Sequence, residues 1–375
     1  MHIAIFGGGQ LARMLALTGL RMGLEFTFII KQSQADESRA IRQLGRVLTY
    51  SQDQESSIAS LLTQLGAVDA VTMESEQLPD AVLAQVARHH PLRPSLSAFS
   101  ICKNRLAERR FLESLGIPIA PYRHLENLAE LDHIEQPVYA KSLTEGYDGK
   151  GQFYIRDNQQ LQHINTQTTA NGWIVEHAVI YSQEVSSIAV RALSGEIALY
   201  PLTANRVEDG ILRMSYAPAR RVSEAAKAAI IQHTQTILRA LDYVGVLAIE
   251  WFVIGDRVIV NEIAPRVHNT GHWTVGAGCT DQFENHLRAI SGLPLGSTQS
   301  RGYAGIVNLL GTEKPPLATL NSNNTLHWYE KRPAPRRKMG HVTFYNASST
   351  KLRQEMLAFE NALTTVSSKA STPGV

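Results

Sequence analysis

Apolar runs of strand length alternate with helical patterns over residues 1–91. The apolar runs are HIAIF, EFTFII, RVLTY and DAVTM, and the helical segments between them include residues 10–22 and DESRAIRQL. Strand–helix alternation at this spacing is typical of a parallel sheet with helices on its faces. Pro91 and Pro94 interrupt the pattern, so we expect the unit to end there.

A different order of elements follows this unit. An amphipathic helix is predicted over residues 103–115, KNRLAERRFLESL, and Gly116 and Pro118 mark its end. Short strands with turns between them come next, in PVYAKS, GQFYIR, GWIVEH, QEVSSIAV and EIALYPL. A helix over residues 223–241, a β-hairpin in GVLAIEWFVIGDRVIVNEIA and a helix in DQFENHLRAISGL complete this part.

The last part of the chain has mainly strand patterns. Strands are predicted in YAGIVNLL, TLHWYE and HVTFYN, followed by a helix over residues 350–363 and a Ser/Thr-rich tail that frays. The order α/β, then α+β, then a small β-rich end predicts three domains, in line with a length of 375 residues. We place these domains at residues 1–100, 101–298 and 299–375.

Composition narrows the class of protein further. Apolar residues make up 44% and charged residues 19%, which is ordinary for a globular protein, and a net charge of +2 is too small to indicate nucleic-acid binding. The apolar runs are too short to cross a membrane, and the N-terminus lacks the pattern of a signal peptide. Two cysteines far apart, Cys102 and Cys279, indicate reduced thiols and a cytoplasmic location.

The stretch GGGQLARM, residues 7–14, follows the first strand and opens a helix. Gly7, Gly9 and Ala12 fit the dinucleotide fingerprint G-x-G-x-x-[GA], which suggests an NADP-dependent oxidoreductase. Lys31 ends the second strand, where such enzymes meet a 2′-phosphate, but the acidic ribose partner is absent. The glycine turn and the helix N-terminus favour an anion or polar ligand in either case.

The predicted hairpin over residues 245–264 carries Glu250 and Glu262 inside otherwise apolar strands. A three-residue turn at Gly255–Arg257 would place the two glutamates directly opposite each other, whereas a two-residue turn would pair Glu250 with Asn261. Opposed like charges destabilise a sheet unless a cation lies between them. Because Mg²⁺ in proteins is often held by one or two carboxylates plus substrate phosphates, the hairpin indicates a magnesium–nucleotide site.

Two further segments have the chemistry of a nucleotide site. AKSLTEGYDGKGQ places Lys141 at a strand end before a glycine-rich loop, whose N–H groups can approach phosphates although no Walker A motif is present. WIVEHAVIYSQEVSS provides Glu176 and Glu184, whose carboxylates can accept from ribose hydroxyls. Residues 177–179 between them can present backbone groups to an adenine edge.

Together these segments resemble the ATP-grasp superfamily. Within it, GGGQLARM, EGYDGKGQ, NEIAPRVHNTGHWT and the HWYEK and RRKMGH segments resemble the 5-(carboxyamino)imidazole ribonucleotide synthetase family, over residues 3–345. The resemblance implies an α/β and α+β protein with a Rossmann-like parallel-sheet domain over residues 1–100. It implies an ATP-grasp domain over residues 101–298, with a lid at about 118–187, and a small β-rich domain over 299–375.

The resemblance also implies an activity in purine biosynthesis. ATP, bicarbonate and 5-aminoimidazole ribonucleotide would react through carboxyphosphate to give the N-carboxylated ribonucleotide, ADP and phosphate. Transfer of a phosphoryl group to bicarbonate needs charge neutralisation, and the carboxyphosphate must be kept from water, for which the loop 143–151 is the natural lid. The family's Mg²⁺, or Mn²⁺ in its place, and a cytoplasmic homodimer without nucleic-acid or membrane partners are implied as well.

The motifs assign roles to individual residues by resemblance. ATP would be held by Arg105, Lys141, Gly146, Tyr147, Asp148, Gly149, Lys150, Gly151, Gln152, Glu176, His177, Ala178, Val179, Glu184, Asn261 and Glu262. The ribonucleotide would be held by Gln10, Leu11, Glu74, Tyr147, Asn269, Lys331, Arg337 and Lys338. Glu250 and Glu262 would bind the metal, and Arg266, His268 and Lys141 would form the catalytic group at the carboxyphosphate.

The sequence departs from the family pattern at a few positions. Ala12 replaces a glycine, Val207 stands where the family often has a histidine near the nucleotide, and RPAPRRKMGH differs from R-P-G-R-K-M-G-H. Another ATP-grasp ligase, such as the formate-dependent glycinamide ribonucleotide transformylase, is an alternative, but HNTGHWT favours the imidazole substrate. A relative that binds a nucleotide without catalysis is disfavoured by Lys141, Glu250 and Glu262. The oxidoreductase alternative leaves the two hairpin carboxylates unexplained.

Overall fold

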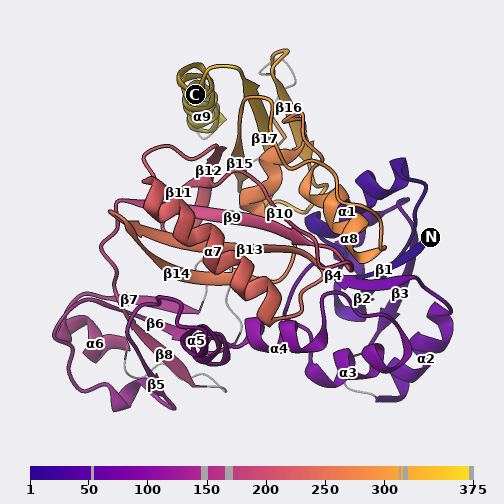
Figure 1. The fold of residues 1–375 in the computed structure, drawn as a ribbon, viewed down its shortest axis with the longest axis horizontal. Coiled ribbons are helices and arrows are strands. Elements are labelled where there is room, and N and C mark those ends of the chain that lie inside the picture. Colours follow the sequence, from indigo (N-terminus) through magenta and orange to yellow (C-terminus); the bar gives the residue numbers. More distant parts are fainter. Residues whose placement is uncertain (52–54, 145–150, 165–171, 312–313, 316–319, 371–375) are drawn as a thin grey trace.

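Three sheets organise the chain in the computed structural model, which describes residues 1–51, 55–144, 151–164, 172–311, 314–315 and 320–370 (Figure 1). One sheet of four strands lies in the N-terminal part, a second sheet of four strands lies in the segment expected to form a lid, and a sheet of nine strands is formed by strands from the remainder of the chain. Among the described helices, none combines the length and the apolar character that a membrane span requires.

The N-terminal sheet is parallel, with strand order β3-β2-β1-β4, as the alternating pattern predicts. Its strands and helices are β1 (His2–Phe6), α1 (Gln10–Arg21), β2 (Glu25–Lys31), η1 (Gln32–Ile41), β3 (Arg46–Tyr50), α2 (Glu55–Leu65), β4 (Ala70–Met73) and α3 (Asp80–His89). The helix expected in DESRAIRQL is present as the 3₁₀ helix η1, which begins and ends a few residues earlier than predicted. Among the described side chains of η1 only Ala40 and Ile41 are buried, which is too little apolar surface to stabilise a longer α-helix.

The helix predicted over residues 103–115 is present as α5 (Arg105–Ser114). A second helix that was not predicted, α4 (Leu96–Lys103), precedes it, and the two are separated at Asn104. Asn104 has an extended backbone, and its side-chain oxygen accepts from the Ala107 N–H at 3.1 Å, which makes it the N-cap of α5. The cap sets the rotation of α5, whose buried face carries Glu108, Arg109 and Leu112.

The sheet in the segment expected to form a lid, called the lid sheet below, is antiparallel with the order β5-β8-β6-β7 (Figure 1). It comprises β5 (Tyr122–Leu125), η2 (Leu128–Glu130), β6 (Val138–Ser142), β7 (Gln152–Ile155), α6 (Asn158–Ile164) and β8 (Trp173–His177). The predicted glycine-rich loop joins β6 to β7, and its residues 145–150 lie outside the described residues.

The large sheet has the order β14-β13-β9-β11-β12-β15-β17-β16, with β10 paired to β9. Its elements are β9 (Gln183–Arg191), β10 (Ile197–Leu199), β11 (Thr203–Glu208), β12 (Ile211–Ala217), α7 (Glu224–Ala240), β13 (Gly245–Ile254), β14 (Arg257–Ala264), η3 (Asn269–Thr274), α8 (Gln282–Ile290), β15 (Tyr303–Leu310), β16 (Asn324–Trp328), β17 (Lys338–Asn346) and α9 (Ser349–Ala370). β15 pairs with β12, so the boundary expected at residue 299 separates strands of one sheet.

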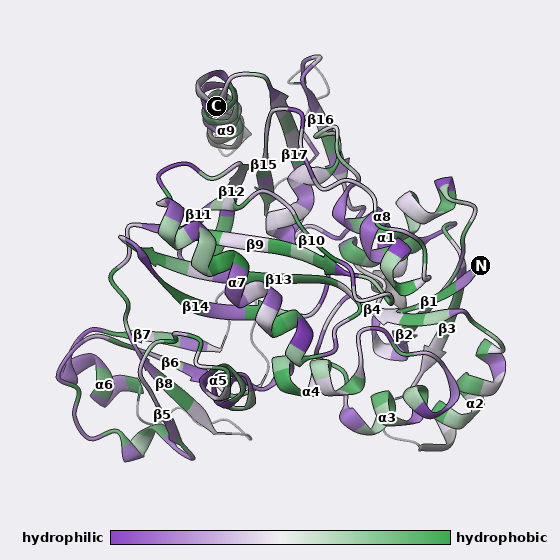
Figure 2. Ribbon diagram, in the orientation of Figure 1, coloured by the Kyte–Doolittle hydropathy of each residue, from purple (hydrophilic) through white to green (hydrophobic). Residues whose placement is uncertain are grey.

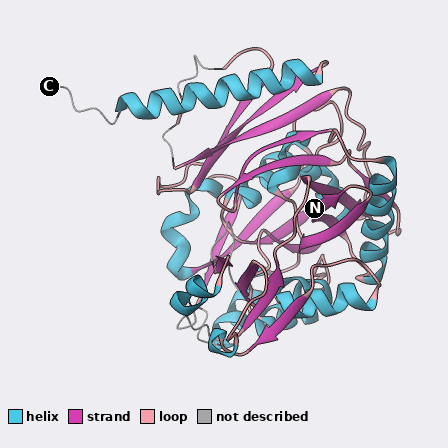
Figure 3. Ribbon diagram, turned by 90° about the vertical axis from the view of Figure 1, so that its left-hand side faces the viewer, coloured by secondary structure: helices cyan, strands magenta, loops and turns pink. Residues whose placement is uncertain are grey.

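The pair β11 and β12 was absent from the sequence prediction. Its turn, Asp209–Gly210, has positive φ at both residues, as a two-residue hairpin of type I′ requires. The Asp-Gly pair in EDGIL was therefore a usable signal, which the polar residues of TANRVE obscured. α9 packs across β15 and β17 and extends beyond the predicted helix as far as Ala370 (Figure 3). Residues 371–375 of the expected tail lie outside the described residues.

Strands β9 and β13 are buried on both faces, and β13 is hydrophobic along most of its length (Figure 2). Alternate residues of a strand point to opposite faces. Ile188 and Val246 therefore join the core under α8, while Ala189 and Leu247 join the core under α7.

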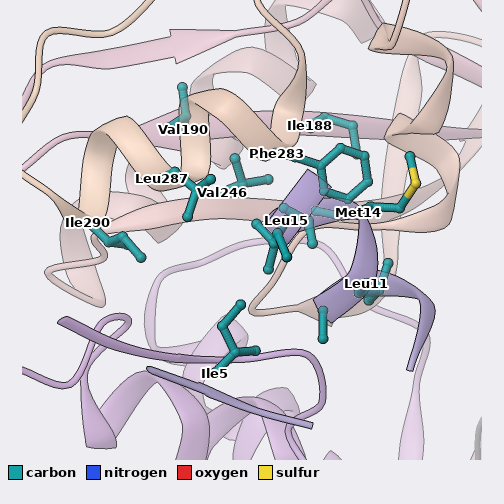
Figure 4. Packing of buried hydrophobic residues seen from close by; sticks show 14 of the residues in the cluster. Ile5, Leu11, Met14, Leu15, Ile188, Val190, Val246, Phe283, Leu287 and Ile290 are labelled. Atoms are coloured by element: carbon teal, nitrogen blue, oxygen red, sulfur yellow. The ribbon is translucent and has the colours of Figure 1, made fainter. Parts of the chain in front are cut away.

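The N-terminal sheet and the large sheet share one core. Leu11, Met14 and Leu15 of α1 pack with Phe283 and Leu287 of α8 (Figure 4). This shared core fixes the glycine turn before α1 relative to the large sheet, so residues of both parts can form one site.

Candidate active site

The hairpin β13–β14 brings Glu250 and Glu262 directly opposite each other, although its turn has only two residues. Ile254 pairs with Arg257, which on its own would set Glu250 against Asn261. A β-bulge between the Trp251–Val260 and Glu250–Glu262 pairs leaves Asn261 as the extra residue and shifts the register by one. The bulge therefore places Glu262 on the same face as Glu250. The sequence left two turn lengths open: the structure has the two-residue turn, yet it also has the Glu250–Glu262 pair that was expected only from the three-residue turn.

His268 joins the two glutamates. One ligand atom from each of Glu250, Glu262 and His268 lies within 4.8 Å of the others, and His268 Nε2 is 3.9 Å from a Glu250 carboxylate oxygen. Burial, together with Glu262 and Glu184, raises the pKa of Glu250 well above its usual range. A cation between the carboxylates would relieve this repulsion, and two carboxylates suit Mg²⁺ or Mn²⁺ better than they suit softer metals.

His268 is held rigidly at the start of η3. Its backbone N–H donates to Gln282 Oε1 at 2.9 Å, and Gln282 Nε2 donates to its carbonyl at 2.7 Å. Burial, with Arg266 and Lys338 nearby, lowers the pKa of His268 well below its usual range, so the imidazole is neutral. Sequence reasoning missed Gln282, which reaches His268 from α8.

A buried set of charges lies beside the hairpin. Lys141 Nζ is 2.6 Å from Glu176 Oε2, and Arg109 Nε donates to Glu176 Oε1 at 2.6 Å. Burial raises the pKa of Glu176, but Lys141 and Arg109 outweigh it and hold that pKa at about 2. Glu108 and Arg109 were not predicted. Glu108 lies four residues and Arg109 three residues before the buried Leu112, a spacing that places charge on the core face of α5.

The other residues predicted to hold ATP fall into two groups. Arg105 donates to the Ser142 carbonyl at 2.7 Å, and Gln152 pairs with Lys141 across β6 and β7. In the segment after β8, the His177 N–H bonds the Pro121 carbonyl and the Ala178 N–H bonds the Pro137 carbonyl. These two N–H groups are therefore hydrogen-bonded within the chain. We expect adenine to contact the backbone carbonyls of this segment and Val179 instead. Gly146, Tyr147, Asp148, Gly149 and Lys150 lie outside the described residues.

Glu184 lines a cleft of about 780 Å³ beside the large sheet. Val207, Tyr216 and, from α9, Arg353 are among the other lining residues. Burial and the neighbouring Glu262 raise the pKa of Glu184 to about 7. Val207 follows a bulge in β11, so the position where the family often has a histidine does open onto the same cleft as Glu184.

The glycine turn before α1 is filled by a carboxylate of the chain itself. Glu74 accepts from the Gly9 N–H at 2.6 Å and from the Ala12 N–H at 3.0 Å. Gly7 has a φ of +124°, and a Cβ there would lie 2.2 Å from Glu74 Cγ. The donors that hold a pyrophosphate in a dinucleotide site are therefore bound to Glu74, which argues against a nicotinamide cofactor.

The remaining residues predicted for the ribonucleotide gather beside this turn. Lys331 donates to Gln10, and Lys338 donates to Asn269. The buried Tyr329, which was not predicted, lies under both lysines, with its ring centroid 5.7 Å from Lys331 Nζ and 5.6 Å from Lys338 Nζ. Leu11 is buried in the shared core, whereas Arg337 donates to the Arg332 carbonyl at 3.3 Å near the surface.

Arg266 connects this group to the hairpin. Its Nε donates to Glu76 at 2.8 Å, an ion pair that sequence reasoning missed although TMESE contains both Glu74 and Glu76. Burial raises the pKa of Glu76, but Arg266 outweighs it and lowers that pKa overall. Arg266 is also close enough to Glu250 and His268 for its positive charge to act to lower the pKa of both groups, so it lies near the hairpin carboxylates.

Three family models match successive parts of the chain. They are the ribonucleotide synthetase preATP-grasp domain over residues 1–103, the ATP-grasp domain over 110–283 and the phosphoribosylaminoimidazole carboxylase C-terminal domain over 304–355. The N5-carboxyaminoimidazole ribonucleotide synthase of Pseudomonas aeruginosa is 37% identical over 367 residues, which cover 96% of this chain and 99% of that protein. The chain belongs to the N5-carboxyaminoimidazole ribonucleotide synthase family.

Solved structures of this family have the same fold. The synthetase from Thermus thermophilus superposes with a TM-score of 0.86 at 39% identity, covering 96% of this chain and 98% of that one. The synthase from Aspergillus clavatus in complex with ADP and 5-aminoimidazole ribonucleotide gives 0.85 at 26% identity, covering 97% and 98%. The predicted ATP-grasp fold and enzyme class are confirmed: the chain is an ATP-dependent ligase that makes N5-carboxyaminoimidazole ribonucleotide in purine biosynthesis. The oxidoreductase and transformylase alternatives are thereby excluded.

Proposed function

We propose that Glu250 and Glu262 bind the metal of the MgATP complex, and that the carboxylation of 5-aminoimidazole ribonucleotide takes place at His268 and Arg266. The observation that carries this proposal is the convergence of one ligand atom each from Glu250, Glu262 and His268 within 4.8 Å of one another. Mg²⁺, or Mn²⁺, would supply charge neutralisation at the β- and γ-phosphates when bound.

The first reaction step takes place on the side of Lys141. A bicarbonate oxygen attacks the γ-phosphorus, the bond to the ADP oxygen breaks, and carboxyphosphate forms. Lys141 neutralises phosphate charge, and Glu176 fixes the lysine at the end of β6. Glu184 and residues 176–179 are proposed to hold ribose and adenine, and the lid sheet excludes water from the reactive intermediate.

The second step takes place on the side of Lys338. The amine of the ribonucleotide attacks the carboxyl carbon, phosphate leaves, and the amine loses one proton. Lys331 and Lys338 bind the substrate phosphate, with Arg337 at the rim, while Gln10, Glu74 and Asn269 bind the ribose and base. His268, neutral and fixed by Gln282, is placed to take the proton, and Arg266 stabilises the departing phosphate.

The test is ADP formation by the purified chain with and without its two co-substrates. We expect turnover to rise strongly only when bicarbonate and 5-aminoimidazole ribonucleotide are both present with MgATP. Absence of stimulation by the pair would overturn the proposed assignment. Gel filtration with light scattering tests the homodimer and cell fractionation tests the cytoplasmic location, both of which are proposals from the family resemblance.

A further inference from the structure

Glu108 and Arg109 form an ion pair in the interior, behind the residues assigned to the metal and to ATP. Arg109 Nη1 donates to Glu108 Oε1 at 2.6 Å, and the exposed fraction is 2% for Arg109 and 3% for Glu108. Burial of two charges is expensive, and a pair of apolar side chains would anchor α5 to the core at lower cost. Packing of α5 alone therefore does not explain why Glu108 and Arg109 are charged.

The pair holds the main chain on both sides of Glu262. Arg109 Nη2 donates to the Asn261 carbonyl at 2.5 Å, and the Ile263 N–H donates to Glu108 Oε2 at 3.0 Å. Asn261 is the extra residue of the β-bulge, and a bulge leaves backbone groups without ladder partners. Glu108 and Arg109 thus take the place of a neighbouring strand at the point where Glu262 is turned toward Glu250.

The same guanidinium reaches the lysine assigned to the phosphates. Arg109 Nε bonds Glu176 Oε1, and Glu176 Oε2 bonds Lys141, each at 2.6 Å. One side chain therefore contacts the bulge of β14, in the large sheet, and the carboxylate that orients Lys141, in the lid sheet. The planar fork of arginine can donate in three directions at fixed angles, which lysine cannot.

We propose that Glu108 and Arg109 are positioning residues that hold Glu262 and Lys141 in one fixed arrangement, and so set the distance between the metal-binding carboxylates and the phosphate-binding lysine. This inference rests on the proposed assignment of those two residues. Neither Glu108 nor Arg109 needs to touch a substrate for this role, because both act through the main chain of Asn261 and Ile263 and through Glu176.

The test compares Arg109→Lys and Glu108→Gln with the wild type. Arg109→Lys keeps the charge but loses the fork, and Glu108→Gln keeps the shape but loses one acceptor oxygen. Arg110→Lys is the matched control, since Arg110 is the next residue of α5 and is exposed. Thermal unfolding and circular dichroism select folded variants. Steady-state rates are then measured against Mg²⁺, ATP and the ribonucleotide, and MgADP binding is measured by calorimetry.

We expect both variants to raise the Mg²⁺ concentration for half-maximal rate and the Kd for MgADP by about tenfold, the usual effect of losing an outer partner of a metal ligand. The KM for the ribonucleotide stays within about twofold of the wild type, and Arg110→Lys changes nothing. Folded variants with unchanged Mg²⁺ and MgADP dependence would overturn the proposal, as would an equal loss for every substrate or unfolding of both variants. A wild type without co-substrate stimulation would overturn the proposed function instead, and the MgADP titration would still decide the role of Arg109.

Discussion

The cationic side chains have different partners on the two sides of the proposed site, the nucleotide side and the ribonucleotide side. On the nucleotide side, Lys141 and Arg109 are paired with the carboxylates of Glu176 and Glu108. On the ribonucleotide side, Lys331 and Lys338 contact the neutral amides of Gln10 and Asn269 and the ring of Tyr329.

A carboxylate partner offsets part of the charge of a lysine and fixes its direction, whereas an amide or a ring fixes the direction of the lysine without opposing its charge. The nucleotide side is therefore suited to a ligand that brings its own divalent cation. The ribonucleotide side is suited to a phosphate that arrives without one. A substitution in one half should accordingly leave the ligand of the other half unaffected.

Glu262→Gln should have the largest effect. It removes one of the two opposed carboxylates, and we expect kcat to fall by about 100-fold or more while the fold survives, because the repulsion with Glu250 is relieved at the same time. The measurement is turnover at increasing Mg²⁺. Turnover close to that of the wild type at saturating Mg²⁺ would contradict the metal assignment.

Lys338→Ala should weaken binding of the ribonucleotide and have little effect on ATP. Loss of one charge-assisted bond to a substrate phosphate, worth about 1.5–3 kcal/mol, should raise the KM for the ribonucleotide by about 10- to 100-fold. The KM for ATP should change by less than about twofold, since Lys338 bonds Asn269, which belongs to the ribonucleotide side of the proposed site. A larger change for ATP than for the ribonucleotide would reverse the assignment of the halves.

Substitutions of Tyr329 can distinguish the contribution of its ring from that of its hydroxyl. Its hydroxyl bonds His341, and its ring lies under the two lysines. Tyr329→Leu should raise the KM for the ribonucleotide by about three- to tenfold, as expected for a buried cation–π contact, and Tyr329→Phe by much less. Equal effects of the two variants would show that the hydroxyl, and not the ring, orients the lysines.

Glu184 should give the smallest effect, visible in stability. Burial raises its pKa to about 7 in the folded chain, so the folded state binds a proton more tightly than the unfolded state does. The stability from this protonated form is complete below the unfolded pKa and is lost as pH rises through about 7. Glu184→Gln should therefore raise the unfolding temperature of the ligand-free chain at pH 8 and not at pH 4. An identical shift at both pH values would show that its ionisation is not involved.

The amino-acid sequence by itself determined most of the order of elements and the residue types of the candidate site, although it did not reveal the pair β11 and β12. Alternation of apolar runs and helical patterns predicted the parallel sheet β3-β2-β1-β4, because each pattern has the period of its own element. The glutamates of the hairpin stood out because charge inside apolar strands is costly unless it has a partner. Motifs then led to the family, which the relatives confirm.

Only the tertiary structure decided how the site closes. The bulge at Asn261 sets Glu262 opposite Glu250, and a bulge depends on contacts from α5 that lie more than 150 positions away in sequence. Glu74 fills the glycine turn, whose local fingerprint suggested a dinucleotide site, because β4 ends beside β1 in the sheet. Both features depend on hydrogen bonds between side chains and distant backbone groups, which the period of a sequence pattern does not encode.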